Sequence, residues 1–252
     1  MTLRCFVLAM VVAGASSAGA QTPTYDLVIH GGRIVDGTGA PSYQADLAVM
    51  NGRISVIGRP DTTKARRVID ATGLVVAPGF IDMMGQSADM FTRGSADAAF
   101  NLLSQGITTI NAGEGESSAP VRADSARAVG WSTMREYFRR LEAAGTPLNV
   151  AQTVGHTTIR QIVIGDSARQ ASPAELERMR GMVEEAMQAG AIGVSTALIY
   201  PPAVYASEEE ITALTAVATS RTCAMKVIVC SRRSMKRCAS AATRTRPYTS
   251  FT

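Results

Sequence analysis

The sequence predicts an α/β protein in which a short β segment precedes alternating strands and helices. Between residues 25 and 75, β-branched runs are separated by Gly and Asn-Gly turns, a pattern typical of short strands. After residue 78, the apolar residues alternate between strand and helix periodicity. Of the 252 residues, 46% are hydrophobic and 18% are charged, which provides for a core. This composition excludes disordered, collagen-like and disulfide-dense chains.

The first segment, residues 21–77, is expected to be a small β module. Its dipeptide Asn51-Gly52 is the preferred turn of a two-residue hairpin, so the flanking strands should pair antiparallel. The predicted strands cover residues 25–30, 33–35, 45–50, 54–57, 67–70 and 74–77.

Residues 78–220 repeat a strand–helix unit about four times. Ser172 followed by Pro173 and Glu175 predicts a helix start, with an N-cap, Pro at the first position and an acid in the first turn. Short loops between alternating strands and helices favour a parallel α/β sheet or a barrel. We expect strands at 80–83 (buried), 107–111, 148–154 and 191–198, and helices at 96–105, 134–144, 173–188 and 208–218.

The carboxyl ends of the predicted strands are the candidate site. In parallel α/β folds the functional groups gather at these ends. Here each end is rich in Gly, polar and acidic residues, as a site requires and a plain connection does not. The four ends are residues 82–89, 111–118, 155–160 and 195–205.

Residues 1–20 have the layout of a secretory signal peptide. Arg4 precedes an apolar run over residues 5–13, and Ala18-Gly19-Ala20 forms a cleavage motif. The apolar run is too short to span a bilayer, so no membrane association is expected after cleavage. Residues 21–220 contain no cysteine, which suits folding in an oxidising compartment. We therefore expect a periplasmic or secreted protein.

Residues 221–252 have a different composition from the rest of the chain. They contain eight basic residues, no acidic residue and three of the four cysteines. If the coding DNA is read one nucleotide earlier, the codons of Met225-Lys226 and of Met235-Lys236 must each contain a Glu codon. With permitted third bases, the segment then encodes a histidine-bearing strand and an amphipathic helix. The opposite shift gives a stop codon at Met225-Lys226. We hypothesise a frameshift near residue 220, so that residues 221–252 are an aberrant basic tail.

Five stretches carry a resemblance to a known family, and they cover most of residues 25–215: YDLVIHGGRIVDGTGAP, GLVVAPGFID, SQGITTINAGEGESSAP, GHTTIR and MVEEAMQAGAIGVSTALIYPPAVYASEEE. In them the sequence resembles the amidohydrolase superfamily, and within it the D-aminoacylase (N-acyl-D-amino-acid deacylase) family. The resemblance implies a partial (β/α)8 barrel preceded by a β-sandwich segment. It also implies hydrolysis of N-acyl-D-amino acids with zinc, which polarises the carbonyl and activates water.

The chain departs from the family pattern at the metal site. Met84 and Gln86 occupy the positions of two metal-binding histidines, and neither replaces an imidazole, so a one-metal site is the arrangement left open. Glu114 stands in the turn where the family often has a metal-bridging Cys, and it is either a metal ligand or a solvated loop acid.

Three further residues are candidates for contact with the substrate. His156 follows a predicted strand and faces either the substrate or a structural hydrogen-bond partner. Tyr200 and Tyr205 flank a Pro-Pro loop and either contact the substrate or pack beneath the loop.

We therefore expect the chain to belong to a hydrolase of carbon–nitrogen bonds whose substrate is a small N-acyl amino acid. The written chain is expected to be inactive, because the family's later metal ligands and catalytic Asp lie beyond residue 220. One alternative is a hydrolase of cyclic amides, similar to dihydropyrimidinase. Another is a nucleic-acid binder acting through the basic tail, but the tail has only Tyr248 and Phe251 for base stacking and no binding motif, so no nucleic acid is expected.

Overall fold

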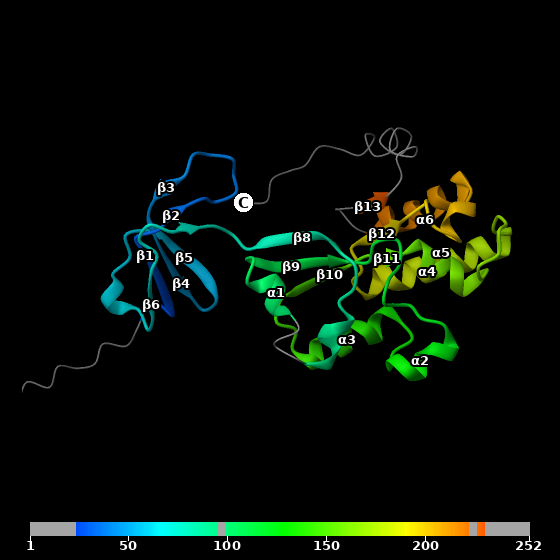
Figure 1. The fold of residues 1–252 in the computed structure, drawn as a ribbon, viewed down its shortest axis with the longest axis horizontal. Helices are drawn as coiled ribbons and strands as arrows, with labels where there is room; N and C mark the ends of the chain where they lie inside the picture. The colour runs from blue at the N-terminus through cyan, green and yellow to red at the C-terminus, as the bar shows by residue number, and fades with distance from the viewer. Residues whose placement is uncertain (1–23, 95–98, 222–225, 230–252) are drawn as a thin grey trace, which may run out of the picture. The chain divides into compact units, whose positions relative to one another are not determined.

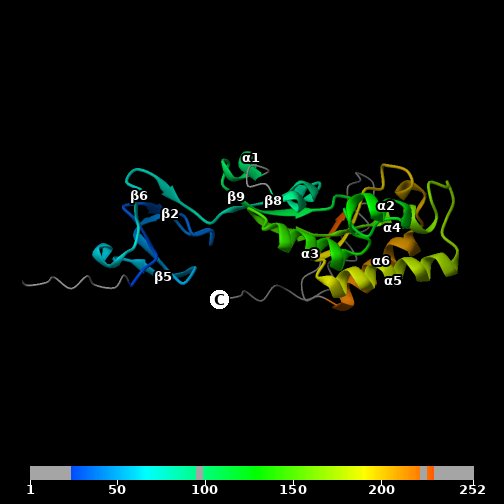
Figure 2. The ribbon, with the colours of Figure 1, turned by 90° about the horizontal axis from the view of Figure 1, so that it is seen from below.

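The computed structural model describes residues 24–94, 99–221 and 226–229 (Figures 1 and 2). The chain divides between Pro78 and Gly79 into two compact units. None of the helices in the described residues is long and apolar enough to cross a membrane.

The first unit consists of short strands in two sheets. One sheet has the order β5-β4-β1-β6 and the other the order β3-β2-β7. The predicted hairpin is confirmed, because β4 and β5 pair antiparallel around Asn51 and Gly52, whose φ angles of 52° and 71° belong to a type I′ turn. The elements are β1 (Leu27–His30), β2 (Arg33–Ile34), β3 (Tyr43–Gln44), β4 (Asp46–Met50), β5 (Arg53–Gly58), η1 (Thr62–Lys64), β6 (Val68–Asp70) and β7 (Val75–Val76).

The second unit contains parallel strands whose spatial order follows their order in the chain. The strands are β8 (Phe80–Gly85), β9 (Ile107–Ala112), β10 (Asn149–Gln152), β11 (Val154–Gly155), β12 (Gly193–Thr196) and β13 (Lys226–Val229). They form two three-stranded sheets, β10-β9-β8 and β11-β12-β13. All pairs in both sheets are parallel. Such pairing requires a crossover between neighbouring strands.

The strand predicted over residues 148–154 is divided between the two sheets. β10 pairs with β9, and β11 pairs with β12. Thr153 lies between them, and its amide donates a 2.9 Å hydrogen bond to the carbonyl of Ala112 on β9. One continuous segment therefore changes partner at Thr153 and connects the two sheets.

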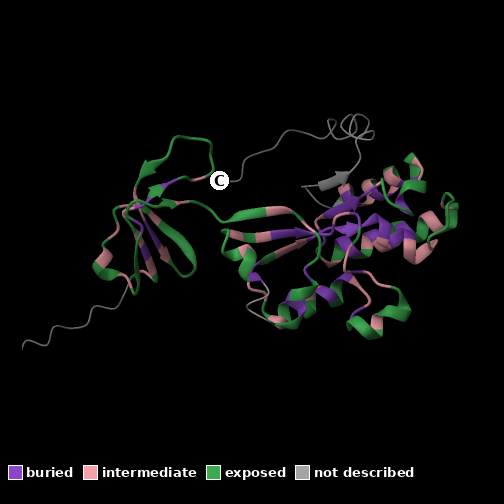
Figure 3. Ribbon diagram, in the orientation of Figure 1, coloured by how far each residue is buried: buried purple, intermediate pink, exposed green. Residues whose placement is uncertain are grey.

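The prediction that residues 80–83 form a buried strand is half wrong. They belong to β8, but Phe80 is 62% exposed and Ile81 is 59% exposed. The reason is topological: β8 lies at the edge of its sheet and pairs only with β9 in the described part of the chain. Figure 3 shows this exposure, while buried residues gather around β11, β12, α4 and α5.

Two helices, α3 and α5, begin at side-chain caps. Thr133 and Ser172 each form a capping box with the Glu three residues later. The helix predicted over 96–105 is described as the shorter α1, and part of the predicted range lies outside the described residues. The helical elements are η2 (Asp89–Arg93), α1 (Phe100–Leu103), α2 (Ala123–Val129), α3 (Met134–Ala144), α4 (His156–Val163), α5 (Pro173–Ala189), η4 (Ala203–Tyr205) and α6 (Glu208–Arg221).

The core of this unit lies between the strands and helices α3 to α6. α5 packs against α3, α4 and α6. Its buried side chains Met179 and Val183 join Ile110 of β9 and Val194 of β12 in one apolar cluster. The spacing of four residues between Met179 and Val183 places both on one face of the helix.

β13 is a strand that the sequence analysis did not predict. Its backbone pairs in parallel with β12, with Gly193 opposite Lys226 and Thr196 opposite Val229. The run Val-Ile-Val favours an extended backbone, because β-branched residues fit a pleated strand. The remainder of the proposed aberrant tail lies outside the described residues, apart from Arg221 at the end of α6.

Candidate functional site

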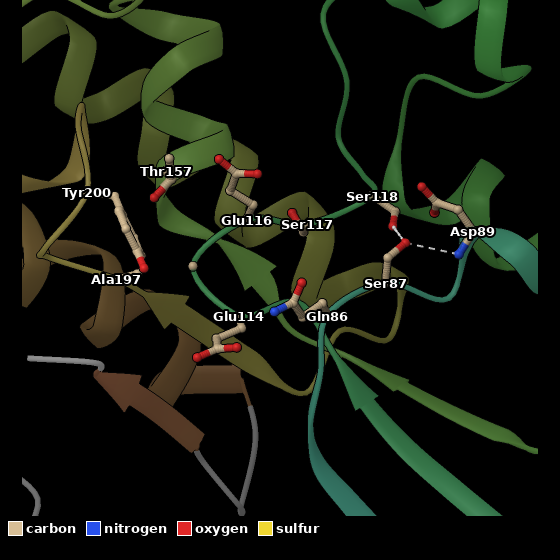
Figure 4. A pocket seen from close by; sticks show the side chains of 11 residues that line it. Gln86, Ser87, Asp89, Glu114, Glu116, Ser117, Ser118, Thr157, Ala197 and Tyr200 are labelled. Carbon is tan, nitrogen blue, oxygen red and sulfur yellow. Dashed lines mark hydrogen bonds between the residues drawn. The ribbon is translucent and has the colours of Figure 1, made fainter. Parts of the chain in front are cut away.

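A cavity of about 520 Å³ lies where the parallel strands end. Its lining comes from the four predicted strand ends: Gln86, Ser87 and Asp89 after β8, Glu114 to Ser118 after β9, Thr157 after β11, and Ala197 and Tyr200 after β12. Figure 4 shows these side chains around one space. The structure thus brings together segments that are far apart in the sequence, as the parallel arrangement predicts.

The loop after β9 depends on glycine. Gly113 and Gly115 have φ angles of 93° and 78°, in the left-handed region that favours glycine. A Cβ on Gly115 would also lie 2.7 Å from the Cβ of Ala197. The loop therefore passes too close to its neighbours for any larger residue at this position.

Hydrogen bonds from three neighbouring segments hold the same loop. The amide of Gly113 donates to the carbonyl of Gln86 at 3.1 Å, and the amide of Gly115 donates to Ser195 Oγ at 3.1 Å. The amide of Ser117 donates to Thr158 Oγ1 at 2.9 Å. The backbone that carries Glu114 is consequently fixed by the end of β8, by β12 and by the first turn of α4.

A buried polar network lies directly behind the cavity wall. His156, Arg160 and Glu210 are at most 1% exposed. His156 Nδ1 lies 2.8 Å from Thr196 Oγ1, and His156 Nε2 lies 2.7 Å from Glu210 Oε1. Arg160, one helical turn after His156 on α4, donates from Nη1 to Glu210 Oε2. Because Thr157 and Ala197 follow His156 and Thr196 in the chain, the network joins two parts of the wall.

Glu210 is ionised at neutral pH in spite of its burial. Burial raises the pKa of a carboxyl group, but hydrogen bonds from His156 and Arg160 and the charge of the guanidinium outweigh it. The pKa of Glu210 is therefore held below its usual value of 4.5.

Three of the six residues singled out in the sequence line the cavity and three do not. Gln86, Glu114 and Tyr200 line it. Met84 and Tyr205 are outside the lining and are 52% and 37% exposed. His156, for which the sequence left open a substrate contact or a structural hydrogen-bond partner, is fully buried, and both its ring nitrogens have partners in the protein.

Several residues of the site were not found from the sequence. Asp89, Glu116 and Ser117 line the cavity, and Ser195 holds the Glu114 loop. Their position at the ends of predicted strands was the feature of the sequence that could have identified them. Glu210 carried no such signal, because it reads as an ordinary acid in the first turn of a helix and its partner His156 lies 54 residues away.

The described residues do not fit a zinc ion by themselves. They contain no group of three or more His, Cys, Asp or Glu side chains that could hold a metal. The buried His156 has no free nitrogen. Glu114 is thus the only predicted metal ligand of the described chain that lines the cavity, and a structural or catalytic zinc needs at least three protein ligands.

Sequence comparison assigns the chain to a family. The model of the Amidohydrolase family matches residues 67–245, which is most of the chain. The chain therefore belongs to the amidohydrolase family, a family of hydrolases.

Three of the similar proteins are a D-aminoacylase and deacylases of N-acyl-D-aspartate and N-acyl-D-glutamate. The chain is 40% identical over 200 residues to an N-acyl-D-aspartate deacylase of Alcaligenes xylosoxydans xylosoxydans, covering 74% of this chain and 39% of the relative. A solved N-acyl-D-glutamate deacylase from Bordetella bronchiseptica, complexed with zinc and a phosphonate inhibitor, is 35% identical with a TM-score of 0.70. The match covers 81% of this chain and 45% of the deacylase. A solved D-aminoacylase with a binuclear metal centre is 35% identical with a TM-score of 0.71. The match covers 78% of this chain and 44% of the D-aminoacylase.

A weaker structural likeness concerns the fold. An L-hydantoinase (dihydropyrimidinase) from Arthrobacter aurescens is 20% identical with a TM-score of 0.52, which shows a shared fold alone. The chain spans less than half the length of each of the three deacylases.

Proposed function

We propose that the chain is the first part of a hydrolase that removes the acyl group from N-acyl-D-amino acids. The observation that supports this most strongly is the identity of 35–40% to three such proteins over 74–81% of the chain. The hydantoinase likeness, at 20% identity, concerns the fold alone and does not favour the cyclic-amide alternative.

The architecture fits the first half of a (β/α)8 barrel behind a β-sandwich segment. Parallel strands in chain order, joined by helices, are what such a barrel requires. The two small sheets before Pro78 would form the sandwich segment. The proposed division is a signal peptide over 1–20, the sandwich segment over 21–77, the half-barrel over 78–220 and the tail over 221–252.

In this proposal the chain's own residues bind and orient the substrate. The cavity gives the N-acyl amino acid a polar site in which Gln86 offers an amide, Glu114 a carboxylate and Tyr200 a ring and a hydroxyl. The hydrogen-bonded loop holds the backbone on either side of Glu114, so its position at the cavity is set before a substrate binds. Because the described residues do not fit a metal, no chemical step is assigned to zinc here; further ligands would have to come from residues outside them.

The test of this function uses a chain completed through the reconstructed frame. The completed protein should release free amino acid from N-acetyl-D-amino acids and leave the L-enantiomers and cyclic amides such as hydantoin unhydrolysed. Preference for hydantoin would favour the alternative. The written chain should be inactive in the same assay.

The frameshift itself is tested at the level of DNA. We propose it because the composition changes at residue 221, where acidic residues stop and three cysteines follow. Resequencing across the codon of residue 220 in independent DNA should show one frame change. An intact frame that encodes the written tail would overturn the frameshift, and β13 would then be a genuine strand of a shorter protein.

Export is proposed from the first 20 residues. Expression with and without this segment, followed by fractionation and mass spectrometry, should show cleavage after Ala20 and a periplasmic or secreted product. A product that keeps residues 1–20 in the cytoplasm would contradict export.

A further inference from the structure

We propose that Gln86 hydrogen-bonds directly to the amide group of the substrate, at a position that the family resemblance assigns to a metal-binding histidine. This inference rests on the proposed function, since it names how the same site recognises an N-acyl amino acid. It starts from a disagreement between this chain and its family, because Met84 and Gln86 stand where the resemblance implies two metal-binding histidines.

The strand ends lack the imidazole and thiolate ligands that zinc prefers. The chain has two histidines, and His30 lies in the first unit. Both ring nitrogens of the other, His156, already have partners in the protein. Residues 21–220 contain no cysteine. In the described part of the chain, the donors left for a metal at the cavity are therefore oxygen atoms.

The carboxylates among the lining residues do not converge on one point. Figure 4 shows the side chains of Glu114 and Glu116 extending to opposite sides of the loop that carries them. The carboxylate of Asp89 interacts with the hydroxyl of Tyr137. Zinc needs at least three protein ligands around one point, and no such group of His, Cys, Asp or Glu exists within residues 24–94, 99–221 and 226–229. The end of β8 is therefore suited to a hydrogen-bonded ligand and not to a metal.

The side chain of Gln86 is available for such a ligand. It is exposed and lines the cavity, and Figure 4 shows its amide extending from the end of β8 toward the Glu114 loop. Within the described residues no protein group is hydrogen-bonded to this amide. The backbone of Gln86 is nevertheless fixed, because its carbonyl accepts a 3.1 Å hydrogen bond from the amide of Gly113. The side chain thus starts from a set place before a ligand binds.

A glutamine side chain is complementary to the amide of an N-acyl amino acid. Nε2 of Gln86 can donate to the carbonyl oxygen of the ligand, and Oε1 can accept from its N–H. A ligand without that N–H leaves Oε1 without a partner in the complex, which weakens binding. The contact recognises the amide bond itself, whatever the side chain of the amino acid.

Two ligands isolate the amide N–H: N-acetyl-D-leucine and its ester analogue, in which an oxygen atom replaces the N–H. They share the acetyl carbonyl, the side chain and the α-carboxylate. Isothermal titration of the full chain should give a Kd for the amide about three- to tenfold lower than that for the ester, as expected for one neutral hydrogen bond. The ratio should be the same in EDTA and in added zinc, because no metal contributes to the contact.

Matched variants assign this preference to Gln86. Gln86→Leu should abolish it, whereas Gln86→Glu keeps an acceptor oxygen and should retain it. Gln188→Leu, at an exposed position on α5, should leave it unchanged. Zinc titrations of the parent chain and of Gln86→Leu should coincide, since any zinc bound by the cysteines of residues 221–252 is common to both.

The outcomes separate this inference from the proposed function. A preference that persists in Gln86→Leu or is lost in Gln86→Glu would overturn the inference and leave the proposed function intact. A zinc site that Gln86→Leu removes would do the same, because Gln86 would then be a metal ligand. Binding of neither ligand would overturn both, because the cavity would then not be the substrate site.

Discussion

Glu210 Oε1 lies 2.7 Å from His156 Nε2, so the first turns of α4 and α6 meet in the interior through two residues that are 54 positions apart. The carboxylate accepts from His156 through one oxygen and from Arg160 through the other. Both carboxylate oxygens accept a hydrogen bond and all three side chains are buried. The stability of each side chain in the interior therefore depends on the other two.

Removing the carboxylate should strongly destabilise the second unit. Glu210→Ala leaves the Arg160 guanidinium buried without its counter-charge, and breaking a buried pair in this way costs about 3–5 kcal/mol. Urea unfolding followed by circular dichroism measures the change in the free energy of unfolding. The control Glu177→Ala removes an exposed partner of Arg180 and should change it by less than about 0.5 kcal/mol. Equal effects of the two variants would contradict the role of the network.

The same network should make the protein sensitive to acid. The pKa of Glu210 is lower in the folded chain than its usual value of 4.5, although burial alone would raise it, because His156 and Arg160 donate to the carboxylate. Between these two pKa values the unfolded chain binds a proton that the folded chain does not, so the free energy of unfolding falls as pH decreases below about 4.5. Urea midpoints measured from pH 6 to pH 3 should show a smaller decrease in Glu210→Gln than in the parent chain. An unchanged slope would exclude Glu210 as the source.

Gly155 should tolerate no side chain. A Cβ there would lie 2.5 Å from the carbonyl carbon of Glu116, which is backbone and cannot rotate away. Gly155→Ala should lower the free energy of unfolding by about 1–3 kcal/mol, as overpacking does. Gly181, within α5, has open space around its Cα, so Gly181→Ala should raise it by about 0.5–1 kcal/mol. Chemical denaturation of both variants distinguishes them, and destabilisation by Gly181→Ala would contradict the packing described here.

The exposed apolar side chains of the edge strand β8 should promote association of the protein while contributing little to its free energy of unfolding. Ile81 is 59% exposed on a strand with an unpaired edge in the described chain, and such edges promote association. Ile81→Thr should change the free energy of unfolding by less than about 0.5 kcal/mol while lowering light scattering at high concentration. The same substitution at Ile110, which is 2% exposed on the adjacent strand β9, should cost about 1–3 kcal/mol. Unchanged scattering after Ile81→Thr would show that β8 is not the associating surface.

The sequence by itself determined the elements that depend on local interactions. Residues 134–144 form a helix within the predicted bounds, and α5 begins at Pro173, because capping boxes satisfy amides within three residues of the cap. The β4–β5 hairpin formed because Asn51 and Gly52 accept positive φ angles. The cavity was also predictable in outline, since Gln86, Glu114 and Tyr200 all follow strands that run parallel.

Only the tertiary structure decided the features that depend on contacts distant in sequence. The division of residues 148–154 between two sheets follows from the separate partners β9 and β12. The exposure of Phe80 and Ile81 follows from the position of β8 at an edge, which apolar composition does not reveal. The role of His156 was decided by Thr196 and Glu210, because a histidine takes its function from whichever groups the fold brings to its two nitrogens.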